Sequence, residues 1–230
     1  MKVIGLIGGM SWESSLEYYR LINQGIKSRL GGLHSARSLM YSVDFEEIEI
    51  LQHRGQWNEA TEIMVDAALR IERGGADCVV ICTNTMHRMA DEVKTNVGIP
   101  LLHIADATAE KIKSAGLGTI GLLGTKFTME QDFYKGRLSD LHNITVITPS
   151  EIERNVIHDV IYGELCLGDI KEGSRSRFIK IIEGLMSKGA EGIVLGCTEI
   201  PLLVRAEDAP IPLFDTTRIH ADYAVDFALR

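Results

Sequence analysis

Several features are scarce in this sequence of 230 residues, and each scarcity excludes a class of protein. Its four cysteines are too few for the disulfide framework of a small secreted domain, which favours a reducing cytoplasm. No apolar run reaches the ~20 residues that a membrane span requires. No basic cluster stands out, and 32 acidic against 24 basic residues give a net charge of −8. We therefore expect neither a nucleic acid nor a membrane as partner.

Short apolar runs alternate with longer amphipathic stretches along the chain. The first run, residues 3–7, ends in Gly-Gly; it is too short for a signal peptide and is followed by no small-residue cleavage site. We interpret it as a buried first strand. Apolar strands separated by helices are typical of a parallel sheet that is covered on both faces. Further strands are expected at 37–43, 78–82, 100–104, 119–123, 144–148 and 192–195.

The sequence also repeats itself at a nearly constant distance. Three segments recur in the same order, at offsets of 116, 114 and 112 residues: 4–8 with 120–124, 75–81 with 189–195, and 99–102 with 211–214. A single match could arise by chance, because apolar strands resemble one another. The three matches together indicate two copies of one α/β unit.

The repeat predicts the domain organisation. We expect an α/β fold with two pseudosymmetric domains, each a mostly parallel sheet flanked by helices, the first formed by residues 1–105 with 213–230 and the second by 106–212. Ligands of open α/β sheets bind beyond the carboxyl ends of the strands. The active site is therefore expected in the cleft between the two domains.

Residues 82–85, Cys-Thr-Asn-Thr, and residues 196–199, Gly-Cys-Thr-Glu, follow equivalent strands of the repeat. The 114-residue offset pairs Thr83 with Cys197. Cys197 has a purely structural interpretation, since free cysteine is commonly buried as a small hydrophobe. Alternatively its thiol is an acid and its thiolate a base. Two such groups on opposite faces of one carbon would remove a proton from one side and return it from the other, which inverts the stereocentre.

These motifs resemble those of the aspartate/glutamate racemase family. Residues 193–201 resemble its second signature, residues 82–87 its first, and the Gly-Gly-Met-Ser stretch at 8–11 its N-terminal loop. The likeness spans nearly the whole chain and is strongest to the aspartate racemase and broad-specificity amino-acid racemase branch. It implies a racemase that needs no cofactor and no metal, acts on a small amino acid and forms a homodimer.

The resemblance also implies roles for individual residues. Thr83 and Cys197 would be the catalytic acid–base pair. Asn84, Thr85 and Thr198 would hold the α-carboxylate and the amine of the substrate. The full set of substrate-binding candidates is Met10, Gln52, Asn84, Thr85, Thr125, Thr198 and Glu199. His87, inside the first signature, is expected to brace the loop, and Cys166 is expected to pack rather than to contact substrate.

One departure from the family pattern concerns the first catalytic position. The family's first cysteine stands directly before Asn-Thr, where this chain has Thr83, and Cys82 lies one residue earlier. Side chains alternate faces along a strand, so Cys82 is expected to point into the core and not to substitute. A threonine hydroxyl is a much weaker acid than a thiol and a poor base.

A second departure concerns substrate charge, because residues 44–49 are acidic where related aspartate racemases are basic. Arg54 is interpreted as a solvated helix residue, which leaves neutral or broad amino-acid specificity open. Two other activities stay open as well: a hydantoin racemase or maleate isomerase of the same superfamily, and a non-catalytic amino-acid sensor. A dinucleotide loop and a zinc site are not favoured, because the Gly5, Gly8 and Gly9 spacing and the Cys78 and Cys82 spacing fit neither.

Overall fold

The computed structural model describes all residues, 1–230. The chain divides into two compact units, the first formed by Met1–Ile104 with His220–Arg230 and the second by Ala105–Ile219. The expected domain boundaries differ from this division mainly near the C-terminus, where residues 213–219 belong to the second unit. The reason is that strand β8 (Leu213–Asp215) pairs with β7 (Gly192–Gly196) and not with the first sheet.

The first unit is built on a four-stranded sheet with the order β2-β1-β3-β4. All its neighbouring strands are parallel. Its strands are β1 (Ile4–Gly8), β2 (Ser38–Ser42), β3 (Cys78–Ile81) and β4 (Leu101–Leu102). Its helices are α1 (Trp12–Leu30), α2 (Phe45–His53), α3 (Trp57–Arg73), the 3₁₀ turn η1 (Thr85–Met89), α4 (Ala90–Asn96) and the C-terminal part of α11 (Thr216–Leu229).

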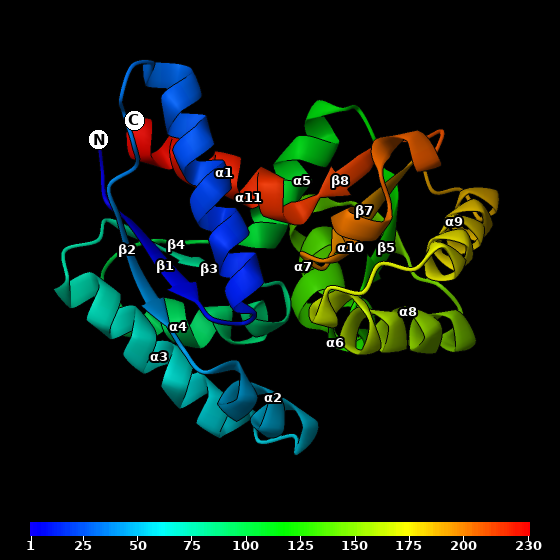
Figure 1. Ribbon diagram of the computed structural model, residues 1–230, viewed down its shortest axis with the longest axis horizontal. Helices are drawn as coiled ribbons and strands as arrows, with labels where there is room; N and C mark the ends of the chain where they lie inside the picture. The colour runs from blue at the N-terminus through cyan, green and yellow to red at the C-terminus, as the bar shows by residue number, and fades with distance from the viewer. The chain divides into compact units, whose positions relative to one another are not determined.

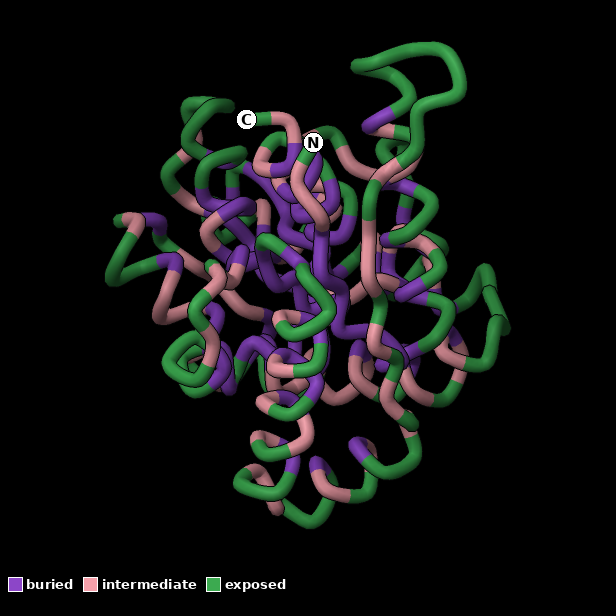
Figure 2. The backbone as a smooth tube through the Cα atoms, turned by 90° about the vertical axis from the view of Figure 1, so that its left-hand side faces the viewer, coloured by how far each residue is buried: buried purple, intermediate pink, exposed green.

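Helices cover both faces of this sheet, as Figure 1 shows for α1 and α3. Ile4 and Leu6 of β1 pack in one buried cluster with α1 and α11, whereas Ile7 packs in a second cluster with α2, α3 and α4. The central strands β1 and β3 are completely buried, and buried residues run along the strands in Figure 2. Burial on both faces accounts for apolar runs without polar alternation.

The second unit repeats this plan, with the strand order β6-β5-β7-β8 and parallel pairing throughout. Its other strands are β5 (Thr119–Gly124) and β6 (Thr145–Ile147). Its longer helices are α5 (Ile104–Ser114), α7 (Asp132–His142), α8 (Glu151–Gly163) and α9 (Glu172–Ser187). Its short turns are α6 (Lys126–Glu130), η2 (Leu165–Leu167), α10 (Ile200–Leu203) and η3 (Ala206–Asp208).

The strand register confirms the repeat that the sequence predicts. Ile4 is paired with Cys78 in the first sheet, and Ile120 with Gly192 in the second. One ladder position therefore satisfies both the 116- and the 114-residue offset. The predicted α/β fold, with two parallel sheets flanked by helices, is confirmed. No helix is long and apolar enough to cross a membrane.

Candidate functional site

The candidate residues fall into two clusters, one in each unit, near the carboxyl ends of the strands. The first cluster comprises Met10, Gln52, Thr83, Asn84 and Thr85, all in the first unit. The second comprises Thr125, Cys197, Thr198 and Glu199, all in the second unit. Each unit thus gathers its own part of the candidate set at the carboxyl ends of its strands, where parallel sheets bind ligands.

A serine network connects the loop after β1 to the end of β3. The Gly9 amide donates to Ser15 Oγ at 2.7 Å, and Ser15 Oγ donates to the Ser11 carbonyl at 2.9 Å. Ser14 Oγ donates to the carbonyl of Cys82 at 2.7 Å, directly before Thr83. The first turn of α1 therefore holds both strand ends in place. Its N-cap is Ser11, whose side chain accepts from the Ser14 amide.

Gly9 is required in this loop for steric reasons. Its φ of +93° is rarely adopted by other residues, and a Cβ there would lie 2.1 Å from the Val43 carbonyl oxygen. The backbones of the first loop and of the chain after β2 therefore approach closely. Met10, directly after it, is buried in the core cluster with α2 and α3.

Within the Thr83–Asn84–Thr85 segment, only the first residue is open to solvent. Thr83 is partly exposed, whereas Asn84 and Thr85 are buried. The preceding Cys82 is completely buried in the cluster with α1 and α11, and burial raises the pKa of its thiol. Cys82 therefore faces the core, as predicted, and the residue presented at the strand end is Thr83.

Gln52, on α2, carries an unsatisfied acceptor. Its side chain is 5% exposed, and its Nε2 donates to Met86 Sδ at 3.0 Å. Its Oε1 is buried and has no hydrogen-bond partner within the chain. A buried carbonyl oxygen without a donor is costly, so this position is suited to a ligand that brings an N–H or O–H group.

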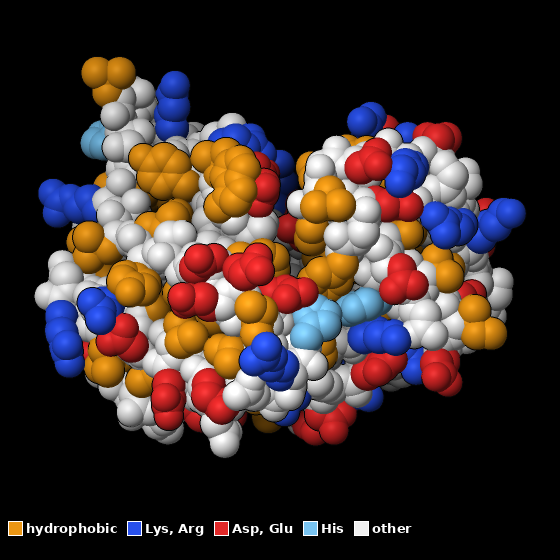
Figure 3. All heavy atoms as spheres, turned by 60° about the horizontal axis from the view of Figure 1, so that its bottom comes forward, with side chains coloured by type: hydrophobic (Ala, Val, Ile, Leu, Met, Phe, Trp, Pro, Cys, Tyr) orange, Lys and Arg blue, Asp and Glu red, His pale blue; other side chains and the backbone are white.

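Negative charge dominates the surroundings of α2. A cavity of about 440 Å³ beside it is lined by Asp44, Glu47, Glu62 and Asp66, and acidic side chains gather on the face shown in Figure 3. Arg54 is the cation that lies nearest to the acidic segment 44–49 along the chain, and it is exposed at the C-terminal end of α2. The sequence-based interpretation of Arg54 as a solvated residue agrees with this position.

The second cluster is organised around one carboxylate oxygen. The partly exposed Cys197 thiol donates to Glu199 Oε2 at 2.9 Å, and the Thr198 hydroxyl donates to the same oxygen at 2.5 Å. Glu199 is buried at 8% exposure. The sequence predicts Glu199 as a substrate ligand, whereas the structure places it against the thiol. Short spacing within the Gly-Cys-Thr-Glu motif is the only signal that could have indicated this contact.

The glycines that precede this cluster allow β5 and β7 to approach. A Cβ on Gly196 would lie 2.8 Å from the Leu123 carbonyl oxygen, and one on Gly124 would lie 3.0 Å from the Gly196 carbonyl oxygen. Thr125 follows Gly124 and caps α6, where its Oγ1 accepts from the Thr128 amide at 3.3 Å. Cys166 lies in η2 and is partly exposed.

The surroundings of Cys197 favour the protonated thiol. Burial raises its pKa well above the ordinary value, and the charge of Glu199 and the hydrogen bond to it raise it further. Cys166 adds a smaller effect in the same direction. The resting group is therefore a thiol with an adjacent carboxylate that can accept its proton. No three side chains of the His, Cys, Asp and Glu types gather to hold a metal ion.

This assignment predicts that Glu199→Gln lowers the pKa of Cys197. The amide removes the negative charge that disfavours the thiolate, so the midpoint of the pH profile for alkylation should move to lower pH. The measurement is iodoacetamide labelling between neutral and alkaline pH, read peptide by peptide by mass spectrometry so that Cys166 is followed separately. An unchanged or higher midpoint at Cys197 would contradict the prediction.

Comparison with known proteins decides the family. The family model described as Asp/Glu/Hydantoin racemase matches residues 7–224. The chain belongs to this family. A candidate Asp/Glu racemase of Yersinia pestis has a crystal structure that is 55% identical, with a TM-score of 0.95 and complete coverage of both chains. The family resemblance predicted from the sequence is thus confirmed.

Two further relatives are more distant in sequence. The aspartate racemase homologue PH1733 of Pyrococcus horikoshii is 33% identical, with a TM-score of 0.88 and complete coverage of both chains. The broad specificity amino-acid racemase RacX of Bacillus subtilis is 21% identical over 164 residues, which are 70% of this chain and 68% of RacX. PH1733 and this chain therefore share one fold along their whole lengths.

Proposed function

We propose that the protein is a cofactor-independent amino-acid racemase that interconverts L- and D-amino acids by proton transfer at the α-carbon. The observation that carries the proposal is the Cys197 thiol, partly exposed at the end of β7 and hydrogen-bonded to the buried carboxylate of Glu199. A thiol with an adjacent proton acceptor is equipped for acid–base chemistry. Membership of the racemase family supports racemisation as the reaction that this acid–base chemistry serves.

The proposed reaction assigns one acid–base group to each face of the α-carbon. Glu199 accepts the proton of Cys197, and the thiolate then removes the α-proton of the bound amino acid. The Thr83 hydroxyl gives its proton to the opposite face; water then returns a proton to the Thr83 alkoxide and takes one from Glu199, which restores the starting state. In the reverse direction the Thr83 alkoxide is the base and the Cys197 thiol is the acid. Thr83 suits the opposite position because it occupies the place in the first unit that Cys197 occupies in the second.

The remaining candidates are proposed to hold the substrate. Asn84, Thr85 and Thr198 offer hydrogen bonds to the α-carboxylate and the amine, and the buried Gln52 Oε1 offers an acceptor for an ammonium N–H. The carboxylates beside α2 would repel the side-chain carboxylate of an acidic substrate bound near that helix. We therefore include neutral amino acids, together with aspartate and glutamate, among the proposed substrates.

The decisive experiment is incubation with single L-amino acids in D₂O without added cofactor. Loss of the α-proton signal by NMR and appearance of the D-enantiomer by chiral chromatography support the racemase. Binding by calorimetry without exchange would indicate the sensor instead. Turnover of a hydantoin or of maleate, with no amino-acid exchange, would indicate another activity of the superfamily. Hydroxylamine, which traps pyridoxal phosphate, should leave the racemisation rate unchanged.

We also propose a homodimer, formed through an apolar face of the first unit. Trp12, Leu16 and Tyr19 form one stripe of α1 and are 65%, 58% and 50% exposed. With Met40 on the edge strand β2 they line a cavity of about 400 Å³ whose lining contains no charged side chain. An uncharged face is suited to a second copy of a chain whose net charge is −8.

Leu16→Glu should convert such a dimer into a monomer. The new carboxylate would be buried against the same face of the second copy, a position where an unpaired charge is strongly disfavoured. Sedimentation velocity of the variant and of the unaltered protein measures the change. Leu141→Glu is the matched control, because Leu141 is 60% exposed on another helix. Equal sedimentation of both variants and the unaltered protein would contradict the proposed face.

A further inference from the structure

We propose that His87 is a positioning residue that fixes the Thr83 loop through a hydrogen bond to the Thr83 carbonyl, and this inference rests on the proposed function. His87 lies on η1, directly after β3 and the loop, and only 2% of it is exposed. Its Nδ1 lies 2.8 Å from the Thr83 carbonyl oxygen. Its Nε2 lies 3.2 Å from the Ile104 amide nitrogen.

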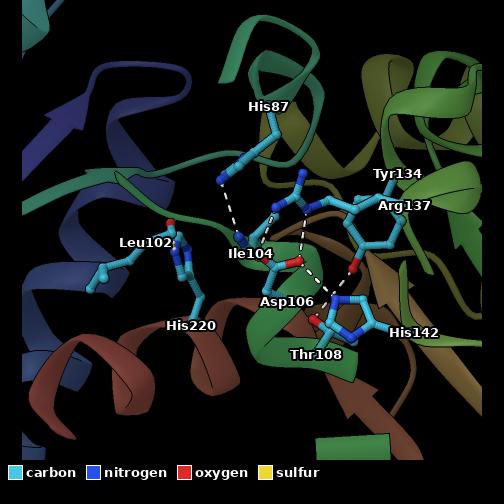
Figure 4. A network of polar contacts seen from close by, with 9 residues as sticks. All are labelled: His87, Leu102, Ile104, Asp106, Thr108, Tyr134, Arg137, His142 and His220. Atoms are coloured by element: carbon cyan, nitrogen blue, oxygen red, sulfur yellow. Dashed lines mark hydrogen bonds and ion pairs between the residues drawn. The ribbon is translucent and has the colours of Figure 1, made fainter. Parts of the chain in front are cut away.

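The two partners of His87 determine its protonation state. A carbonyl oxygen only accepts hydrogen bonds, so Nδ1 must carry the hydrogen that is donated to Thr83. A backbone amide only donates, so Nε2 must keep its lone pair to accept from Ile104. His87 is therefore held as the neutral Nδ1–H tautomer, with both ring nitrogens used. Figure 4 shows its ring reaching from η1 toward the start of α5.

Two further buried histidines pack against the ring of His87. The ring centroids of His87 and His220 are 5.5 Å apart, and those of His87 and His103 are 4.7 Å apart. His220 Nδ1 lies 2.9 Å from the Tyr18 hydroxyl oxygen, and its Nε2 donates to the Leu102 carbonyl at 2.7 Å. His220 is completely buried, and both of its ring nitrogens are hydrogen-bonded. The ring of His87 thus packs against at least one side chain, His220, that is itself held by hydrogen bonds.

A hydrogen bond to the Thr83 carbonyl can fix the positions of the proposed reacting groups. It belongs to the peptide group between Thr83 and Asn84, so one hydrogen bond limits rotation of both residues. The loop gains a second restraint from the His87 amide, which donates to the Asn84 carbonyl at 3.1 Å. Misplacement of a reacting group by about 1 Å can cost a hundredfold in rate. His87 does not need to touch the substrate to have such an effect.

Two conservative variants separate the two hydrogen bonds of His87. In His87→Asn the side-chain amide nitrogen takes the place of Nδ1, so the donor to Thr83 is retained and the acceptor for Ile104 is lost. In His87→Gln the side-chain oxygen takes the place of Nε2, so the acceptor is retained and the donor to Thr83 is lost. Both variants lose one hydrogen bond, and we expect similar decreases in Tm.

The proposal predicts different activities for these equally destabilised proteins. His87→Asn should keep most of the α-proton exchange rate, and His87→Gln should lose about 10- to 100-fold in kcat. His34→Asn and His34→Gln are matched controls at an exposed histidine, and both should behave like the unaltered protein. Equal loss in the two His87 variants, in proportion to their Tm, would overturn the positioning role.

Two readouts do not depend on catalysis. Imidazole ¹⁵N shifts of the unaltered protein should show His87 as the neutral Nδ1–H tautomer at neutral pH, and an Nε2–H or a charged ring would overturn the proposal. Amide hydrogen exchange at residues 84–86 should accelerate in His87→Gln and not in His87→Asn. If the unaltered protein exchanges no α-proton, the proposed function fails, and these two measurements still decide whether His87 holds the loop.

Discussion

Cys197→Ser is expected to abolish both α-proton exchange and racemisation. A serine hydroxyl keeps the hydrogen bond to Glu199 but is a far weaker acid than the thiol, so neither position 197 nor Thr83 would then hold a group that ionises readily. Loss of a general acid–base group costs about 10²–10⁴-fold, and here the same group acts in both directions. The measurements are NMR exchange in D₂O and chiral chromatography with the best substrate of the panel.

Cys166→Ser is the matched control for this variant. Cys166 is also a partly exposed thiol of the second unit, but it lies in η2 and is not a member of the strand-end cluster. We expect it to keep most of the activity, and circular dichroism should show both variants folded. An active Cys197→Ser protein would exclude the proposed mechanism, because the group proposed to remove the α-proton would be absent from it.

Thr83→Cys is expected to raise turnover, by about tenfold or more if protonation from the Thr83 side limits the rate. The substitution provides a thiol with an ordinary pKa near 8.5 at a partly exposed position, in place of a hydroxyl that hardly ionises. The cysteine side chain is slightly smaller than that of threonine. The hydrogen bond from the His87 ring to the Thr83 carbonyl does not involve the side chain at position 83. Initial rates should be measured from both enantiomers of the same amino acid.

Thermodynamics limits what this variant can change. Enantiomers have equal free energies, so kcat/KM must be the same in both directions for the unaltered protein and for the variant alike. The weak acid Thr83 can make kcat and KM individually unequal between L- and D-substrate, and Thr83→Cys should reduce that inequality. Cys82→Ser is a control for a thiol that faces the core. A Thr83→Cys protein with lower turnover would argue against Thr83 as the second acid–base group.

The sequence predicts the sheets well because buried parallel strands leave an unmistakable apolar pattern. The segments expected at 78–82 and 192–195 correspond to β3 and β7 within one residue at each end, and the repeat predicts their shared register. The edge strand β4 is shorter than expected, because only Leu101 and Leu102 pair with β3. The length of an edge strand depends on how far it pairs with its single neighbouring strand. The local pattern of apolar residues does not reveal that length.

The candidate site is only partly predictable, and the reason lies in side-chain conformation. Alternation along a strand is enough to place Cys82 in the core and Thr83 at the strand end. It is not enough to show that Glu199 turns back to the Cys197 thiol, or that the Gln52 oxygen has no donor, because both depend on rotamers. The bonds of His87 to Thr83 and Ile104 likewise join residues up to 17 positions apart.

The division of the chain also determines the order in which its parts can be completed during synthesis. The second unit is one continuous segment, whereas the first lacks a piece of its core until residues 220–230 have been made. Ala221, Ala224 and Val225 in that piece cover the strand face that carries Ile4 and Leu6. Domains commonly fold from the N-terminus as the ribosome releases them. Here the unit whose synthesis begins first is completed last, and the sheet face that carries Ile4 and Leu6 lacks part of its cover until then.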